Sequence, residues 1–303
     1  MSKNILVIGA GELGTQVLLA LAKHPNLPLE THISVLLRPS SISTPSPQKA
    51  SELEILRQNN ITLVPGDITA STQSTLASLF SAYDTIISCT GFSAGRGTQI
   101  KLAKAVLDTK IPRYIPWQFG VDYDVIGRGS AQDLFDEQLD VRDLLRAQDT
   151  TKWVIVSTGM FTSFLFEPSF GVVDLSQNVV TALGGWDNRV TVTGPVDIGR
   201  VTAELVLRDE FVDRAVYVAG DTVSYEQVAE IVERVTGKTV ERKVRTVMDA
   251  RNDLAREPEN GLFKYQVVFG EGRGVAWDVK ETWNHQRGMH LQTAEEWARG
   301  NLL

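Results

Sequence analysis

The sequence is short of cysteine, of histidine and of positive charge. One of its 303 residues is cysteine and four are histidine, and Asp and Glu outnumber Lys and Arg by 37 to 30. The single cysteine, Cys89, excludes an intrachain disulfide framework, and the few histidines without an HExxH-like spacing predict no metal site. The net charge of −7 and the pI near 5.2 argue against a nucleic-acid-binding surface, which needs clustered basic residues.

Long apolar runs are missing as well. No segment approaches the roughly 18 uncharged apolar residues of a membrane span. The first residues, MSKNILVIGAG, run straight into a short strand pattern and not into a signal-peptide core. We therefore expect a soluble cytoplasmic protein with no nucleic-acid or membrane partner, and a homodimer is compatible with these features.

Short apolar runs alternate with helical patterns through the first half of the chain. The runs predict strands at residues 4–8, 33–37, 61–64, 85–89, 113–116 and 153–157, with helices near 13–23, 48–59, 72–82, 98–109 and 131–148. This pattern is typical of a doubly wound parallel α/β sheet of the Rossmann type. We expect a nucleotide-binding domain over 1–157 and a smaller α+β substrate lobe over 158–303, with a soft boundary because a strand can return to the first domain.

A glycine-rich turn follows the first predicted strand. Gly9, Gly11 and Gly14 form a GxGxxG pattern that opens the first predicted helix. The first glycine permits the tight turn, the second lets a pyrophosphate approach the backbone, and the third lets the helix pack on the strand. In this strand-to-helix context the pattern predicts a dinucleotide site.

The end of the second strand predicts which cofactor binds. Leu37 is followed by Arg38, Pro39, Ser40 and Ser41, with no acidic residue to accept hydrogen bonds from a ribose 2′-hydroxyl. A guanidinium followed by hydroxyls suits a 2′-phosphate, which favours NADPH. The Ser- and Pro-rich stretch RPSSISTPSPQ predicts an irregular surface loop. Asp67, just past the third strand, either bonds the adenine amino group or caps a turn.

Gln138 interrupts the apolar stripe of the helix predicted over LFDEQLDVRDLL, residues 134–145. At 100° per residue, Leu134, Val141 and Leu145 fall within about 40° of one another, and Gln138 lies about 20° from Leu145 on the same side of the helix. A buried amide without partners costs roughly 1 to 3 kcal/mol. Either neighbouring backbone satisfies Gln138 or its side chain serves a binding site.

These stretches together resemble the NmrA-like and isoflavone-reductase-like group of atypical short-chain dehydrogenases, in particular its fungal members. The resemblance rests on the glycine turn, Arg38, Gln99, RYIPWQFGVD, FDEQLDVRDLL and VSTGMFTSFLF, and it continues through VDIGRVTAEL and YEQVAEIVERVTGK. It implies cofactor contacts from Gly9, Gly11, Leu13, Gly14, Arg38, Thr90, Gly91, Phe92, Met160 and Phe161. From their positions we add Glu12, Ser40, Asp67, Gln118 and Gln138 as candidate cofactor-binding residues.

Two departures from the plant reductases bear on the chemistry. Their fifth strand usually ends in Ser-Glu-Phe-Gly, where this chain has Trp117-Gln118-Phe119-Gly120. Gln138 stands where they carry a lysine proposed to assist proton transfer, and glutamine has no accessible pKa with which to act as an acid or base. The candidate proton sources are then Tyr123, Asp122 or water.

Three functions are compatible with these residues. The first is an NADPH-dependent reductase of an aromatic or polyketide-like small molecule in natural-product metabolism, with Gln138 orienting ribose or substrate. Its candidate substrate-binding residues are Trp117, Phe164, Trp186 and His285. The second is a cofactor-binding sensor without turnover, which the missing lysine favours. The third is a non-redox isomerase or dehydratase with Asp122 or His285 as base.

Overall fold

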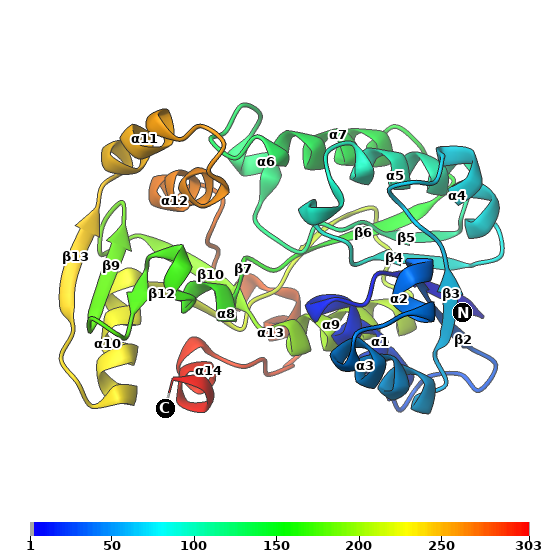
Figure 1. The fold of residues 1–303 in the computed structure, drawn as a ribbon, viewed down its shortest axis with the longest axis horizontal. Coiled ribbons are helices and arrows are strands. Elements are labelled where there is room, and N and C mark those ends of the chain that lie inside the picture. The colour runs from blue at the N-terminus through cyan, green and yellow to red at the C-terminus, as the bar shows by residue number, and fades with distance from the viewer. Residues whose placement is uncertain (1–2, 303) are drawn as a thin grey trace. The chain divides into compact units, whose positions relative to one another are not determined.

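The six strands predicted in the first half form one parallel sheet (Figure 1). The computed structural model describes residues 3–302. The strands are β1 (Asn4–Ile8), β2 (His32–Leu37), β3 (Thr62–Pro65), β4 (Thr85–Ser88), β5 (Arg113–Ile115) and β6 (Lys152–Ser157), and β11 (Arg214–Tyr217) adds a seventh. The order is β11-β6-β5-β4-β1-β2-β3, and the recorded pairs among β1 to β6 are parallel. The prediction of a doubly wound α/β sheet is confirmed.

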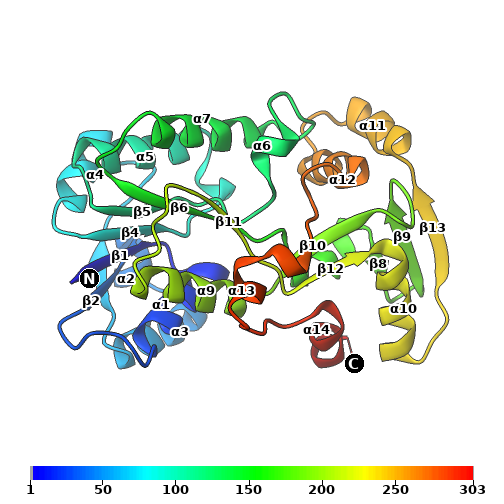
Figure 2. The same cartoon turned by 180° about the vertical axis from the view of Figure 1, so that it is seen from behind.

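Helices cover both faces of this sheet. One face carries α4 (Gln73–Phe80), α5 (Thr98–Asp108) and α7 (Leu134–Arg146), and the other carries α1 (Glu12–Ala22), α3 (Pro47–Gln58) and α9 (Pro195–Leu207) (Figures 1 and 2). Under the first set, Phe80, Leu102 and Val141 pack on Leu6 and Ile86 in one buried cluster. Because the sheet is covered twice, its strands read as nearly continuous apolar runs instead of alternating ones.

The stretch after β2 differs from the sequence prediction. It was expected to be irregular, but Pro39–Ser43 form the short helix α2 and α3 begins at Pro47. Proline at a first helical position lacks only an N–H that would have no intrahelical partner, and its fixed φ suits a helix. The two prolines therefore start helices here.

The chain divides into two compact units whose segments alternate along the sequence. The first unit holds residues up to 118, 137–156 and 198–215, and the second holds 119–136, 157–197 and 216–303. This division differs from a single boundary after residue 157. The segments alternate for two reasons. Residues 119–136, after β5, belong to the second unit, whereas most of α7 belongs to the first. Helix α9 then packs beside α1, so residues 198–215 also belong to the first unit.

Two three-stranded sheets form the frame of the second unit. One contains β7 (Met160–Phe161), β10 (Arg189–Thr193) and β12 (Asp221–Ser224), and the other contains β8 (Val173–Asp174), β9 (Val179–Leu183) and β13 (Glu241–Arg245). The helices of this unit are α6 (Tyr123–Ile126), α8 (Thr162–Leu165), α10 (Tyr225–Thr236), α11 (Val247–Arg256), α12 (Gly261–Glu271), α13 (Trp283–Gln286) and α14 (Ala294–Asn301). Helix α10 begins at a capping box between Ser224 and Gln227, and α10 and α12 lie on opposite sides of β9 (Figure 2).

Gly199 is the point at which α9 touches α1. An ideal Cβ on Gly199 would lie 2.7 Å from the main-chain carbonyl atoms of Gln16, whereas a Cβ on Gly300 would meet nothing within 4 Å. We expect Gly199→Ala to lower the unfolding free energy by about 2 kcal/mol, because backbone cannot move aside. In α14, Gly300→Ala should raise it by about 0.5 kcal/mol. Urea unfolding measures both, and a Gly199→Ala variant as stable as the parent would contradict the contact.

Candidate functional site

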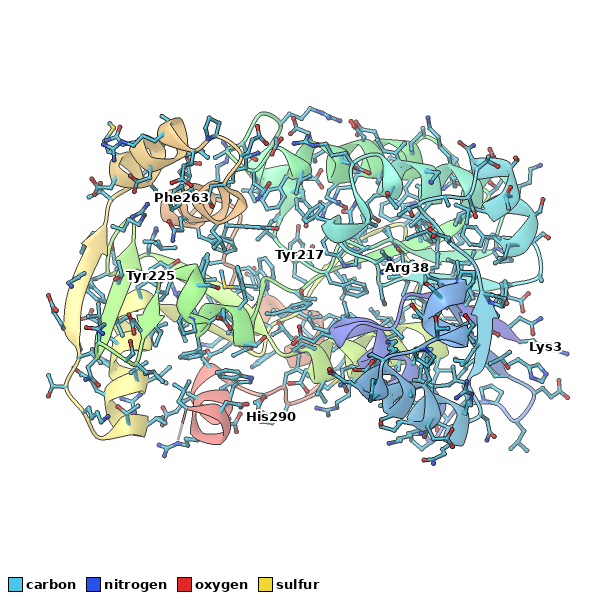
Figure 3. The ribbon with its side chains drawn as sticks, viewed as in Figure 1. Lys3, Arg38, Tyr217, Tyr225, Phe263 and His290 are labelled. Carbon is cyan, nitrogen blue, oxygen red and sulfur yellow. The ribbon has the colours of Figure 1, made fainter. Side chains whose placement is uncertain are left out.

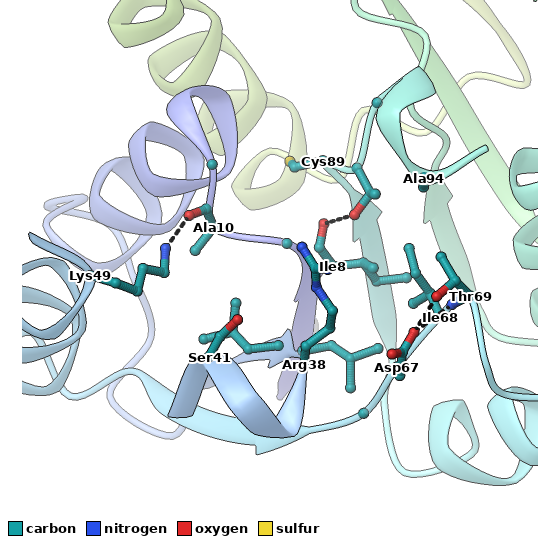
Figure 4. A pocket seen from close by; sticks show the side chains of 17 residues that line it. Ile8, Ala10, Arg38, Ser41, Lys49, Asp67, Ile68, Thr69, Cys89 and Ala94 are labelled. Atoms are coloured by element: carbon teal, nitrogen blue, oxygen red, sulfur yellow. Dashed lines mark hydrogen bonds between the residues drawn. The ribbon is translucent and has the colours of Figure 1, made fainter. Parts of the chain in front are cut away.

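A pocket of about 340 Å³ opens in the first unit where β1, β2, β3 and β4 end (Figure 4). Its lining includes the 9–11 turn, Arg38, Ser41, Lys49, the 66–69 loop and the 89–91 turn. Six of the predicted cofactor-binding residues line it, namely Gly9, Gly11, Arg38, Asp67, Thr90 and Gly91. The pocket lies at the carboxyl edge of a parallel sheet, where ligands bind in such folds.

Each glycine of the turn after β1 has its own geometric reason. Gly9 has φ +92°, and a Cβ there would lie 2.7 Å from Thr90 Oγ1. A Cβ on Gly14 would lie only 2.2 Å from the carbonyl oxygen of Gly9, whereas one on Gly11 would meet nothing within 4 Å. Gly11 is the N-cap of α1, and no side chain bonds the amides of that helix start. The helix N-terminus is therefore open to an anion.

Basic and hydroxyl side chains reach the pocket from α2 and α3. Arg38 is exposed and lines the pocket together with Ser41 and Lys49. The Lys49 Nζ donates to the carbonyl oxygen of Ala10 at 2.7 Å and to Glu52 Oε2 at 2.8 Å. Ser40, the serine predicted to bind cofactor, is exposed and does not line the pocket, because α2 turns the next residue toward it.

Asp67 uses one carboxylate oxygen to close its own loop. Its Oδ1 accepts from the Thr69 hydroxyl at 2.6 Å, from the Thr69 main-chain N–H at 2.8 Å and from the Ala70 N–H at 3.1 Å. These bonds, the hydroxyl first, lower the pKa of Asp67, and the nearby charge of Arg38 lowers it further. Of the two predicted roles, the turn cap is the one that these hydrogen bonds establish.

The turn after β4 is packed by an aromatic pair. The rings of Phe92 and Trp117 meet edge to face with centroids 4.5 Å apart, and a Cβ on Gly91 would lie 3.0 Å from the Trp117 ring. The Thr90 hydroxyl donates to the Ile8 carbonyl at 3.1 Å, and Gln99 Nε2 donates to the Thr90 carbonyl at 2.7 Å. These contacts place the half-buried Trp117 beside the 90–92 turn. Its predicted contact with substrate stays a prediction.

Gln118 and Gln138 are neighbours with opposite hydrogen-bonding states. Gln118 Nε2 donates to the main-chain oxygen of Gln138, and its Oε1 accepts from Arg142 Nε, both at 2.8 Å. All three side chains are fully buried. The Gln138 side chain has no partner at either amide atom. Gln118 therefore ties α7 to the end of β5, and its predicted contact with a cofactor stays a prediction. Neighbouring backbone does not satisfy Gln138.

The remaining predicted cofactor residues lie outside the pocket lining. Glu12 is exposed on the first turn of α1, whereas Leu13 and Gly14 are buried beneath it. Met160 and Phe161 form β7 of the second unit, where they pair with β10. A contact of these residues with a cofactor stays a prediction.

Asp122 and Tyr123 are both bound into the second unit. Asp122 Oδ1 accepts from the Val125 N–H at 3.2 Å as the cap of α6, and its Oδ2 accepts from the Tyr217 hydroxyl at 2.7 Å. Tyr123 is 3% exposed and packs edge-on against Phe135. The predicted role of Tyr123 as a proton donor stays a prediction. Sequence reasoning missed Tyr217, since no local pattern connects it with Asp122.

The predicted substrate-binding residues of the second unit have different neighbours, and their contact with a substrate stays a prediction. Phe164 packs against Phe170, with ring centroids 4.6 Å apart. The ring of Trp186 faces the Arg242 guanidinium at 5.7 Å. His285 is exposed on α13 and not in an apolar lining, because its helix buries Trp283 and Asn284 instead.

Within residues 3–302, no three His, Cys, Asp or Glu side chains come together as a metal-binding group. No helix there is long and apolar enough to cross a membrane. Burial also raises the pKa of the Cys89 thiol, so the sulfur at the pocket wall is neutral.

A model of the NmrA-like family matches residues 1–297. The chain belongs to the NmrA-like family. It is 48% identical over 301 residues to a protein of Gibberella moniliformis named an NmrA-like family domain-containing oxidoreductase, with 99% of this chain and 98% of that one covered. The resemblance stated from the sequence is confirmed.

Solved structures share the fold at low sequence identity. The crystal structure of an isoflavone reductase matches over the full length of both chains, with a TM-score of 0.81 and 18% identity. A leucoanthocyanidin reductase–NADPH complex from Vitis vinifera matches over 97% of both chains, with a TM-score of 0.79 and 19% identity. The NmrA-like chain thus carries a fold that is also found among reductases.

Gly11 and Gly14 offer a matched pair of alanine substitutions. We expect Gly14→Ala to lower the unfolding free energy by more than about 2 kcal/mol, because its methyl group would collide with the Gly9 carbonyl. Gly11→Ala should keep stability within about 1 kcal/mol while blocking the open helix start, so that NADP⁺ binding weakens at least about tenfold. Urea unfolding and titration calorimetry measure these effects. Unchanged NADP⁺ affinity in Gly11→Ala would contradict the assignment.

Proposed function

We propose that this chain is an NADPH-dependent oxidoreductase that reduces an aromatic or polyketide-like small molecule. The proposal rests on one observation, the open start of α1 in a pocket whose polar rim carries Arg38 and Lys49. It is supported by the oxidoreductase name of the relative from Gibberella moniliformis and by the NADPH complex of the leucoanthocyanidin reductase.

The residues of the pocket fit this cofactor. When bound, NADPH supplies a hydride from its nicotinamide ring. The main-chain N–H groups at the start of α1 would hold the diphosphate, and Arg38, Ser41 and Lys49 would hold the 2′-phosphate. Selection of NADH over NADPH normally requires an acid that accepts bonds from the ribose 2′-hydroxyl. The Oδ1 atom of Asp67 already accepts hydrogen bonds within its own turn, and its carboxylate lies near Arg38. This use of the nearby acid supports a preference for the 2′-phosphate of NADPH.

Gln138 is proposed to act at the nicotinamide end. A fully buried amide with neither polar atom bonded is rare in native proteins, and a bound ribose or substrate oxygen would satisfy it. A hydrogen bond from its Nε2 to a substrate oxygen would stabilise negative charge that develops there. Gln138 holds no transferable proton, so the proposed sources of the proton are Tyr123, Asp122 and water.

The direct test is NADPH oxidation over a panel of aromatic ketones, enones and benzylic ethers. Consumption of NADPH with a matching reduced product supports the proposal. Tight NADPH binding without oxidation of any substrate, together with a partner protein recovered on the loaded chain, would replace it with a sensor. Substrate conversion by cofactor-free protein would replace it with a non-redox enzyme.

Arg38 should set the choice of cofactor. We expect Arg38→Met to raise the KM for NADPH by about 10- to 100-fold, the range of one lost charged contact, and to leave the KM for NADH within about twofold. The control is Arg57→Met, which removes a positive charge from the exposed side of α3, outside the pocket lining. We expect it to change neither the KM for NADPH nor the KM for NADH. Equal losses for the two cofactors in Arg38→Met would show that Arg38 does not read the 2′-phosphate.

Gln138 and Gln118 should respond oppositely to the same substitution. Gln138→Met removes an unbonded amide, so we expect the unfolding free energy to rise by about 1 kcal/mol while kcat/KM falls at least about tenfold. Gln118→Met removes two buried hydrogen bonds and should lower the unfolding free energy by about 2 kcal/mol. Urea unfolding and steady-state kinetics separate the two. Full activity in Gln138→Met would end the proposed role of that side chain.

A further inference from the structure

A carboxylate of α7 holds the start of α5. Glu137, the residue before Gln138, is half-buried, and both of its oxygens accept hydrogen bonds. Oε1 accepts from the N–H groups of Gln99 at 2.8 Å and Ile100 at 3.3 Å, and Oε2 accepts from that of Gly97 at 2.9 Å. Gly97 is the N-cap of α5 and has no side chain that could bond these amides. A helix that comes later in the chain therefore supplies the cap.

Helix α5 in turn bonds the wall of the pocket that follows β4. Gln99 Nε2 donates to the Thr90 carbonyl at 2.7 Å, and the Thr98 hydroxyl donates to the Ala94 carbonyl at 2.9 Å. Thr90 and Ala94 both line the pocket. Gln99 is 4% exposed, so water competes little for its bond to Thr90. The first residues of α5, whose amides Glu137 accepts, are thus the ones that hold this wall.

The same helix also bonds the loop after β3. Lys101 Nζ donates to the carbonyl oxygens of Thr69 at 3.2 Å and Ser71 at 3.1 Å. Thr69 lines the pocket in the loop that Asp67 closes. All of these residues, Glu137 included, belong to the first unit. Helix α5 therefore connects α7 with two separate walls of the pocket.

The strand order places these two walls on opposite sides of the glycine turn. It runs β4-β1-β2-β3, so the turn after β4 and the loop after β3 flank the turn after β1. Arg38, at the end of β2, lies on the β3 side (Figure 3). With the diphosphate at the start of α1 and the 2′-phosphate at Arg38, the adenosine half of the cofactor would lie over β2 and β3. The turn after β4 is then left for the nicotinamide half.

We propose that Glu137 is a positioning residue for the nicotinamide half of the cofactor. By fixing the start of α5 it fixes Gln99, and through Gln99 the Thr90 carbonyl at the pocket wall. A carboxylate suits this task, because three N–H groups and the positive end of the α5 dipole both favour a negative charge. The contact also fixes α7 beside Gln138. The identity of the nucleotide rests on the proposed function.

The test compares NADP⁺ with adenosine 2′,5′-bisphosphate, which lacks the nicotinamide half, by titration calorimetry on the full chain. Glu137→Gln turns one end of the side chain into a donor that faces an N–H group, so at least one of the three bonds is lost. We expect NADP⁺ to bind at least about fivefold more weakly, which is about the value of one hydrogen bond, and the bisphosphate to bind within about twofold of the parent.

The sign of this effect separates positioning from charge. Electrostatics alone predict tighter binding in Glu137→Gln, because removal of a negative charge favours an anionic ligand. A role confined to the stability of α5 predicts a lower Tm with unchanged affinity for NADP⁺. Either result, or an equal loss of affinity for the two nucleotides, would overturn the proposal.

Gln99→Met shows whether Glu137 acts through Gln99. It removes the bond to Thr90 directly, so we expect the same selective loss of affinity for NADP⁺. In the double variant, Glu137→Gln should then add less than about twofold, since both residues act through one contact. Losses that multiply fully would overturn the proposal. If Glu137→Gln does not fold, Gln99→Met alone decides, and an equal loss for the two nucleotides would overturn it.

Helix α5 supplies matched controls. Asp108→Asn removes the same charge from the last residue of α5, where the carboxylate accepts from Gln73 outside the pocket, and it should change neither affinity. Lys101→Met should weaken both nucleotides by a similar factor of at least about three, because it frees the loop on the adenosine side, and the exposed Lys104→Met should weaken neither. A selective loss for NADP⁺ in Asp108→Asn or in Lys101→Met would overturn the assignment.

Binding needs no turnover, so this proposal and the proposed function can fail separately. If no substrate consumes NADPH but Glu137→Gln loses affinity for NADP⁺ selectively, the proposed function fails and the role of Glu137 stands. If NADPH is consumed but Glu137→Gln binds NADP⁺ as the parent does, only the role of Glu137 fails.

Discussion

The close approach of α1 to the turn after β1 is the constraint on which the cofactor unit depends. The Gly14 Cα lies so near the Gly9 carbonyl that no side chain fits between them. That contact sets the start of α1 at the carboxyl edge of the sheet, with Gly11 open in front of it. Every other part of the pocket is a strand end or a neighbouring helix arranged around this point. The returning helix α9 then packs on the same helix through Gly199.

Three buried glutamines show that the same side chain serves different purposes in one fold. Gln118 uses both ends of its amide to join α7 to β5, so it contributes to stability. Gln138 and Gln132 leave both ends unmet, one in each unit, which costs stability in the protein alone. Buried polar groups without hydrogen-bond partners occur most often at functional sites, because a ligand supplies the missing hydrogen bonds there.

Much of the first unit is predictable from local sequence. Strand β1 and the helix after it follow from an apolar run and a glycine pattern, and the roles of Gly9, Gly11 and Gly14 follow from their spacing. Arg38 at the end of β2 was found for the same reason, since its neighbours in the chain are its neighbours in the pocket. Lys49 and the bond between Asp122 and Tyr217 were not found. Lys49 reaches the Ala10 carbonyl from the next helix but one, and Tyr217 lies 95 residues from its partner.

The sequence by itself determined the alternation of strands and helices, the glycine turn, the cation at the end of β2 and the family, because each is written in adjacent residues or in periodic spacing. It also showed that a polar side chain at position 138 lies in an apolar stripe. Only the tertiary structure decided that Gln118 is bonded and Gln138 is not, that Asp67 closes its own loop, and that Ser41 and not Ser40 faces the pocket. The bonding of Gln118 depends on segments about twenty residues away, and the side of α2 that faces the pocket depends on packing, so neither is a local pattern. Asp67 bonds residues two and three positions on, and the sequence left that local role beside a second one.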